Sequence, residues 1–127
     1  MAKHNEIGKI GENIAADFIK NKGLTLLERN YWKPYGEIDI VAREKDLTRF
    51  IEVKAVSYET ARSRVPHETI RPEENLHIHK IRRLRRVIEA YVVSHGTGEW
   101  TFDLMCVYVN RKERTAKVKW LKDIVLS

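Results

Sequence analysis

Four charged residues in the first half of the chain have the types and the spacing needed for metal-assisted hydrolysis. Glu37 and Asp39 alternate with apolar residues in one segment, and Glu52 and Lys54 do so in the next. Successive side chains of a strand point to opposite faces, so each pair lies on one face of its strand. Three carboxylates and one ammonium therefore meet on one side if the two segments form a hairpin.

These residue types favour phosphodiester hydrolysis without a covalent intermediate. Asp39 and Glu52 would supply carboxylate oxygens to a hard cation such as Mg²⁺, and the Val53 carbonyl could add another ligand. The cation polarises a phosphate and lowers the pKa of an attacking water. Lys54 would stabilise the developing charge or orient that water. The scheme requires neither a histidine nor a cysteine.

A purely structural interpretation competes with this one. Charges that alternate with apolar residues are typical of a half-solvated sheet. However, the same strand faces also carry the apolar residues Val41 and Phe50. Removing a carboxylate from water on such a covered face costs free energy unless it is paired or bound to a cation. The structural alternative is that these charges form internal salt bridges, with Lys54 facing Glu37 or Asp39.

The elements that position these residues follow from periodicity and turn residues. The hairpin segments are rich in β-branched and aromatic residues, and apolar residues recur at helical spacing from Ile7 to Phe18. We expect one domain over 1–127, of α/β class, with a mixed sheet of about five strands flanked by two main helices. In order, the pattern predicts a helix over 5–22 ending at Gly23, a strand over 24–32, the hairpin over 36–54, a loop over 57–75, a helix from about Pro72 or Glu73 to Ser94, a strand over 100–109 and an edge strand over 115–120.

Two helical residues are placed to approach the hairpin. Glu12 lies on a helix flank beside the small residues Gly8 and Ala15, where a carboxylate could approach another element, although a solvated glutamate fits equally well. Lys80 falls on the inward side of the second helix with Leu84. It either extends its ammonium group to solvent or points into a cleft.

The basic residues suggest a polyanionic partner. The net charge is +6, and the run from Lys80 to Arg86 contains five basic residues. Arg82, Arg83 and Arg86 lie on the outer surface of the helix, either as a solvated face or as a surface that follows phosphates. The predicted loop over 57–75 is also basic, and is either a flap over a substrate or a disordered connection.

Other features restrict the class of protein. The single cysteine, Cys106, excludes a disulfide framework, sits in an apolar run and indicates a reducing, cytoplasmic environment. No segment approaches the roughly 20 apolar residues of a membrane span, and we expect no membrane association. His77 and His79 point in different directions on a helix, which disfavours a zinc site.

The order of these motifs resembles a known family. A helix with Gly11-Glu12 is followed by Arg29-Asn30-Tyr31, Gly36-Glu37-Ile38-Asp39, Glu52-Val53-Lys54 and a basic helix with Lys80 and Arg83-Leu84. This ordered set resembles the YraN-type family, which is similar to the PD-(D/E)XK nuclease superfamily and, within it, to archaeal Holliday-junction resolvases. The resemblance implies a restriction-endonuclease-like core.

The resemblance also implies roles for individual residues. Asp39, Glu52 and Lys54 would be catalytic, with Glu12, Asp39, Glu52 and Val53 around Mg²⁺ or Mn²⁺ and Glu37 in support. Lys80 would be the basic residue that such proteins often place on the helix after the core strands, and Arg82, Arg83 and Arg86 would contact nucleic acid. The resolvases further imply a homodimer.

The leading hypothesis is therefore a metal-dependent nuclease acting on DNA, with branched DNA as the substrate that the resolvases suggest. One departure from the resembled pattern supports an alternative. Ala55-Val56 follow the lysine where YraN-type sequences typically have Thr-Arg, which removes a hydroxyl and a cation near the expected phosphate. The alternative is a catalytically inactive nucleic-acid-binding module with the same fold.

Overall fold

The computed structural model describes the backbone of residues 2–58 and 78–126 and the side chains of residues 6–58 and 80–126. The predicted loop over 57–75, His77 and the start of the second helix before residue 78 lie largely outside this range. The described elements are α1 (Ala2–Asn21), β1 (Thr25–Lys33), β2 (Gly36–Glu44), β3 (Leu47–Ser57), α2 (Ile78–His95), β4 (Trp100–Asn110) and β5 (Thr115–Ile124).

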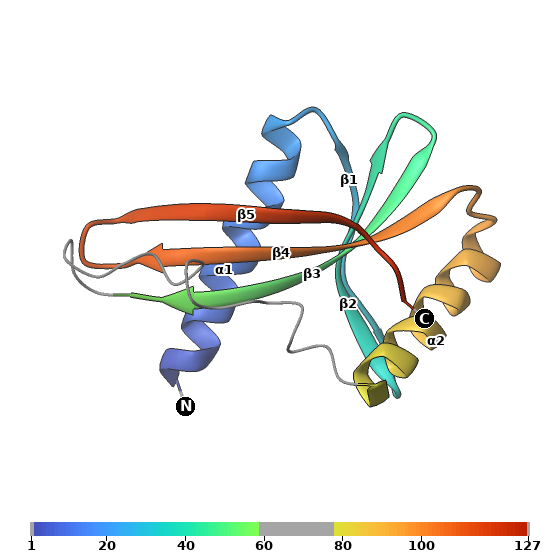
Figure 1. Ribbon diagram of the computed structural model, residues 1–127, viewed down its shortest axis with the longest axis horizontal. Coiled ribbons are helices and arrows are strands. Elements are labelled where there is room, and N and C mark those ends of the chain that lie inside the picture. The colour runs from blue at the N-terminus through green and yellow to red at the C-terminus, as the bar shows by residue number, and fades with distance from the viewer. Residues whose placement is uncertain (1, 59–77, 127) are drawn as a thin grey trace.

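The five strands form one mixed sheet in the order β1-β2-β3-β4-β5 (Figure 1). Neighbouring strands are antiparallel except β3 and β4, which are parallel. A parallel pair needs a long crossover, and here the connection between β3 and β4 contains α2. The predicted α/β class, with a mixed five-stranded sheet and two helices, is confirmed.

Each face of the sheet packs against one helix. The α1-side cluster and the α2-side cluster are separate hydrophobic cores, as expected when strand side chains alternate between two covered faces. The α1-side cluster is built on Ala15, Ala16, Ile19, Leu24, Ile40, Ala42, Ile51, Met105, Val107 and Val109. The α2-side cluster is built on Ile38, Val41, Phe50, Leu84, Val87, Ile88, Tyr91 and Phe102.

The end of α1 follows from one glycine. Gly23 has a φ of +92°, a conformation that residues with a Cβ rarely adopt. Its N–H donates to the Lys20 carbonyl, and the Leu24 N–H donates to the Ile19 carbonyl at 3.0 Å. This is the Schellman arrangement, in which the residue after the glycine returns to the core. Leu24 and Ile19 are accordingly both buried.

A second glycine sets how closely α1 approaches the sheet. A Cβ placed on Gly11 would lie 2.5 Å from the Cβ of Ala55 on β3. Real side chains do not tolerate such a distance, so only glycine allows this helix to sit where it does. The approach matters because the next residue, Glu12, is a predicted site residue.

Gly11→Ala is expected to reduce the free energy of unfolding by about 1–3 kcal/mol, because overpacking outweighs the better helix propensity of alanine. Urea unfolding measures the change. Ala55→Gly removes the opposing methyl group, and the double variant should lose less stability than the sum of the two single variants. Additive losses would show that the two positions do not compete for space.

The predicted edge strand and inward helix face are confirmed with corrections. β5 is an edge strand but extends to Ile124 rather than ending at Trp120. On α2, Leu84 is buried on the inward side as predicted, and Val87, Ile88 and Tyr91 are buried with it. Among the described helices, none combines the length and apolar character needed to cross a bilayer.

Candidate active site

The site lies where β2 and β3 separate. Their ladder reaches only as far as the pair Ile40 and Ile51, and beyond it the Val53 N–H donates to Asp39 Oδ2 at 2.8 Å. Ile38 and Ile40 belong to opposite clusters although they are two residues apart, so the regular alternation of side chains between the two faces is interrupted here. The carboxylate of Asp39 therefore replaces a backbone acceptor where the ladder ends.

Four carboxylates influence one another around this point, and we call Glu12, Glu37, Asp39 and Glu52 the carboxylate cluster. Asp39 is only 8% exposed. Burial raises its pKa from 3.8 to about 8, with Glu52 the next largest cause and Glu12 and Glu37 smaller ones. The hydrogen bond from Val53 opposes the rise. The cluster therefore concentrates more negative charge than its surroundings balance.

Glu12 joins the cluster from α1 and is held there by β1. Asn30 donates its side-chain amide to Glu12 Oε1 at 3.1 Å, and an Arg29 nitrogen lies 3.9 Å from the same oxygen. Asn30 has a φ of +52°, which asparagine tolerates better than most residues and which aims its amide at the helix. Sequence reasoning named this segment only as part of the family resemblance and assigned it no role.

Glu52 is held by Lys80. The Lys80 ammonium lies 2.7 Å from Glu52 Oε2, and the glutamate side chain is only 15% exposed. Lys80 therefore points towards the site, which is one of the two orientations that the sequence left open. In this structure Glu52 therefore binds the Lys80 ammonium group, and Asp39 accepts a hydrogen bond from the backbone of β3.

Lys54 has a different environment from the rest of the predicted set. It is exposed, and within residues 6–58 and 80–126 no ion pair joins it to Glu37 or Asp39. The ion pairs recorded for the cluster are instead Lys80–Glu52 and Arg29–Glu12. Lys54 and Glu52 are two residues apart on one strand, so the ammonium group remains available on the face that carries Glu52.

Glu37 lies at the margin of the cluster. It is exposed, yet its pKa is raised, chiefly by partial burial and then by Glu12 and Glu52, while a hydrogen bond from Asn30 opposes the rise. The supporting position predicted for Glu37 is consistent with this placement, because its charge adds to the field at Asp39.

The donor set of the cluster fits a hard divalent cation. Carboxylate oxygens are the ligands that Mg²⁺ and Mn²⁺ prefer, and the raised pKa of Asp39 reflects negative charge that a cation would neutralise. In the part of the chain that the structure describes, no three Asp, Glu, His or Cys side chains are already grouped to hold an ion. Binding would therefore have to compete with the partners that Asp39 and Glu52 now have.

The predicted contact residues of α2 are exposed. Arg82, Arg83 and Arg86 all lie on the outer surface of the helix. The guanidinium carbon of Arg86 lies 4.1 Å from the ring centre of Tyr35, a cation–π contact that restrains one of the three. Exposure agrees with both predicted interpretations, a solvated face and a phosphate-binding surface.

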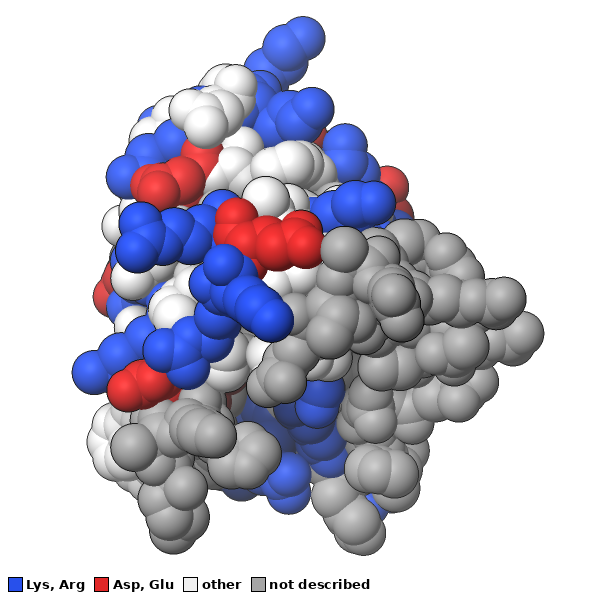
Figure 2. All heavy atoms as spheres, turned by 90° about the vertical axis from the view of Figure 1, so that its left-hand side faces the viewer, with Lys and Arg blue, Asp and Glu red and all other residues white. Residues whose placement is uncertain are grey.

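A further basic region was missed by the sequence analysis. Figure 2 shows Lys and Arg side chains gathered around fewer Asp and Glu side chains at the end of the molecule with the β4–β5 turn. The exposed residues Arg111, Lys112 and Arg114 belong to this turn. Local pattern assigns them no role, because they fall between two predicted strands.

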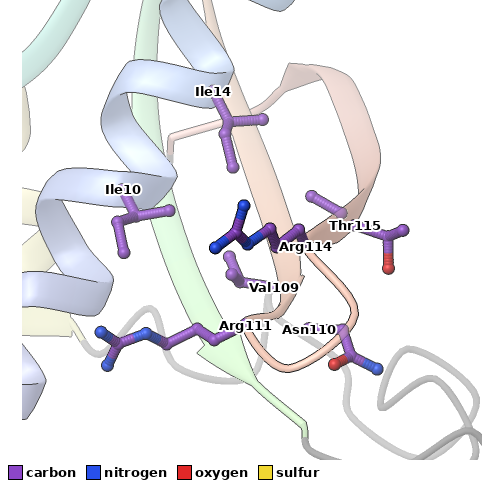
Figure 3. Close-up of a pocket in the computed structure, with 8 residues that line it drawn as sticks. Ile10, Ile14, Val109, Asn110, Arg111, Arg114 and Thr115 are labelled. Atoms are coloured by element: carbon purple, nitrogen blue, oxygen red, sulfur yellow. The ribbon is translucent and has the colours of Figure 1, made fainter.

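Two of these arginines border a cavity of about 450 Å³ between α1 and the β4–β5 turn. Its apolar wall includes Ile10, Ile14 and Val109, and the guanidinium group of Arg114 extends across it (Figure 3). Arg111 pairs with Glu6 at 3.1 Å. Glu12 lies on the opposite flank of α1 from the isoleucines, so this cavity is separate from the carboxylate cluster.

Asp103 does not belong to the candidate site. The residue is fully buried, and both of its carboxylate oxygens accept hydrogen bonds from Arg49, at 3.2 and 3.1 Å. Trp120 and the backbone of Asp123 also donate to it. It anchors β3, β4 and β5 to one another.

The model of the uncharacterised protein family UPF0102, the YraN family, matches residues 11–107. A UPF0102 protein of Moorella thermoacetica is 38% identical over 117 residues, 91% of each chain. One from Flavobacterium psychrophilum is 35% identical over 114 residues, 89% of each chain. One from Dictyoglomus turgidum is 32% identical over 120 residues, covering 93% of this chain and 95% of the relative.

Proposed function

Because the chain belongs to the UPF0102 family, whose description assigns no activity, we propose from its own residues that it is a metal-dependent nuclease hydrolysing phosphodiester bonds in DNA. The observation that carries the proposal is the buried Asp39 carboxylate, whose pKa is raised to about 8 within a group of four carboxylates. Strongly perturbed carboxylates cluster at functional sites more than elsewhere.

Each residue of the site would have a separate role in metal binding or catalysis. Asp39 and Glu52, with Glu12 and the Val53 carbonyl, would hold Mg²⁺ or Mn²⁺, which when bound polarises a phosphate and makes water acidic. Lys54 would donate to a phosphate oxygen as negative charge develops, since its ammonium group is exposed beside Glu52. Glu37 would add negative charge at the margin of the carboxylate cluster.

The basic groups around the cluster would position the substrate. Lys80 lies against Glu52 and would turn to a phosphate once the glutamate binds a cation. The exposed residues Arg82, Arg83 and Arg86 would contact the backbone through charge, which fixes position without reading sequence. Branched DNA and a homodimer are the substrate and assembly that the resolvase resemblance suggests, and sizing by light scattering tests the second.

The decisive experiment incubates the pure protein with duplex, single-stranded and branched DNA, with Mg²⁺, with Mn²⁺ and with a chelator. We expect cleavage that needs the metal. Lys54→Ala should lower the cleavage rate about 10²–10³-fold, because a donor to developing charge is lost.

Lys20→Ala is the matched control, since Lys20 is an exposed lysine at the end of α1 and outside the site. Cleavage that survives both Lys54→Ala and Asp39→Asn would come from a contaminating nuclease and would refute the proposal. A protein that folds and binds DNA but shows no metal-dependent turnover would instead favour the second candidate function.

That second candidate is a nucleic-acid-binding module without catalysis. Two observations favour it: Lys80 already neutralises Glu52 at 2.7 Å, and Ala55-Val56 follow the lysine. It requires salt-sensitive binding and no rise in thermal stability when Mg²⁺ or Mn²⁺ is added. For the nuclease, by contrast, either metal should stabilise the wild type at pH 8, since a ligand that binds only the folded state raises its stability.

A further inference from the structure

Three lysines of β3 and β5 are aligned by the register of the sheet. Lys54 lies beside Cys106 of β4, and Cys106 lies beside Lys119 of β5. Tyr108, two residues further along β4, lies beside Lys117. The lysines thus flank a strip of β4 whose side chains are buried.

The two β5 lysines lie on the face of the sheet that carries Glu52. Val118 and Trp120 pack against the α1-side cluster, so alternation along β5 directs Lys117 and Lys119 to the opposite face. That is the face on which Glu52 meets Lys80 of α2. The lysines therefore continue the surface of the candidate active site towards the edge of the sheet.

Exposure and charge show that the lysines are available. Lys54 and Lys117 are exposed and Lys119 is half-buried. Over residues 6–58 and 80–126, no ion pair joins any of them to a carboxylate. Burial raises the pKa of the Cys106 thiol, and the charges of Lys54 and Lys119 both lower it. Both ammonium groups therefore lie near this thiol. A hollow of about 310 Å³ lies beside Tyr108, Lys117 and Lys119.

Protection of a sheet edge explains these lysines only in part. Lysines on an edge strand discourage pairing with another chain, and β5 is an edge. However, Lys54 is on β3, the middle strand of five. Edge protection also does not require the two β5 lysines to share a face with Glu52.

We propose that Lys54, Lys119 and Lys117 form a phosphate-binding row, which leads one strand of the nucleic acid from the carboxylate cluster across β4 to the edge at β5. The row rests on the proposed function and adds the path of the substrate to it. Two strand spacings separate Lys54 from Lys119, about 10 Å. This distance corresponds to roughly three nucleotides of one strand along a B-form axis.

The test measures DNA binding by fluorescence anisotropy in chelator, so that no cleavage occurs, over a series of salt concentrations. Lys117→Gln/Lys119→Gln should lower the slope of log affinity against log salt by about 1.4–1.8, since each lost phosphate contact removes about 0.7–0.9. Affinity at a fixed salt concentration near 0.15 M should fall about tenfold or more. Lys117→Arg/Lys119→Arg keeps both charges and should retain the slope.

Lys122→Gln is the matched control, because Lys122 is exposed on the same strand but lies over the Trp120 ring, 4.2 Å from its centre, on the α1 side. Its slope should match the wild type. If Lys117→Gln/Lys119→Gln left the salt slope unchanged, or if Lys122→Gln lowered the slope equally, the proposed phosphate-binding row would be wrong. Metal-dependent cleavage by the wild type would not be affected by that outcome. A wild type that binds no DNA would overturn both the row and the proposed function.

Discussion

Asp39→Asn is expected to make the protein more stable at pH 8 and to abolish its metal-dependent cleavage. Asparagine keeps an oxygen that accepts the Val53 N–H, which now lies 2.8 Å from the carboxylate. It carries no charge for Glu52 and Glu12 to repel, and it is a poorer ligand for a hard cation. Stability and activity therefore change in opposite directions, as is common for residues kept for function.

The pH dependence of stability follows from the raised pKa of Asp39. Below about pH 4 the carboxyl group is protonated in the folded and the unfolded chain alike. Between 3.8 and about 8 the folded protein retains a proton that the unfolded chain has released. Over that window the contribution of Asp39 to the free energy of unfolding falls by at most roughly 1.4 kcal/mol for each pH unit. Above pH 8 it changes no further.

Urea unfolding at pH 5 and pH 8 measures this effect. The wild type should lose stability between the two values, and Asp39→Asn should lose clearly less. Asp46→Asn is the matched control, since Asp46 is exposed in the turn between β2 and β3. If Asp39→Asn and the wild type lost the same stability, Asp39 would not be the strained carboxyl group. Cleavage by Asp39→Asn at the wild-type rate would remove Asp39 from the chemistry.

Arg49→Met is expected to cause a large loss of stability, about 3–5 kcal/mol, because it leaves a buried carboxylate without its cation. The Arg49 side chain is 7% exposed and that of Asp103 is 0% exposed, and their charged atoms lie 3.1 Å apart. The same guanidinium nitrogen bonds Asp123 at 3.1 Å, and Nε bonds Glu44 at 2.9 Å. Methionine fills the space and replaces none of these bonds.

Unfolding in urea at pH 7 tests this network against two comparisons. Arg43→Met removes an exposed arginine of the same hairpin and should cost under about 0.5 kcal/mol. Arg49→Met/Asp103→Asn removes both charges and should recover part of the loss. Together with Asp103→Asn alone, it completes the double-mutant cycle that gives the coupling energy of the pair. A loss below about 1 kcal/mol in Arg49→Met would show that water or another cation compensates Asp103.

Much of the candidate site could be predicted from local pattern. Strand alternation placed Glu52 and Lys54 on one face, and helical spacing placed Lys80 inward, where it meets Glu52. These inferences depend on periods of two and 3.6 residues, which the chain carries in its own order. The gap from Glu44 to Leu47 is likewise short enough to indicate the hairpin from the sequence alone.

Long-range partners were beyond such reasoning. Arg49 and Asp103 are 54 residues apart in the chain, and nothing in their local sequence connects them. The network that joins Asp103 to Arg49 therefore appears only when the strands are packed. Val87 was also missed, because the width of the buried face of α2 depends on how the helix is rotated against β2 and β3.

The sequence by itself determined the types of residue that meet in the cluster, the two-residue spacing that pairs them on a strand, and the five-stranded α/β class. Only the tertiary structure decided where the β2–β3 ladder stops, and therefore that Asp39 accepts the Val53 N–H and has a raised pKa. The register of β3, β4 and β5 likewise aligned Lys54 with Lys119. Registers and pKa values depend on burial and on contacts between distant segments, which arise only when the chain is packed.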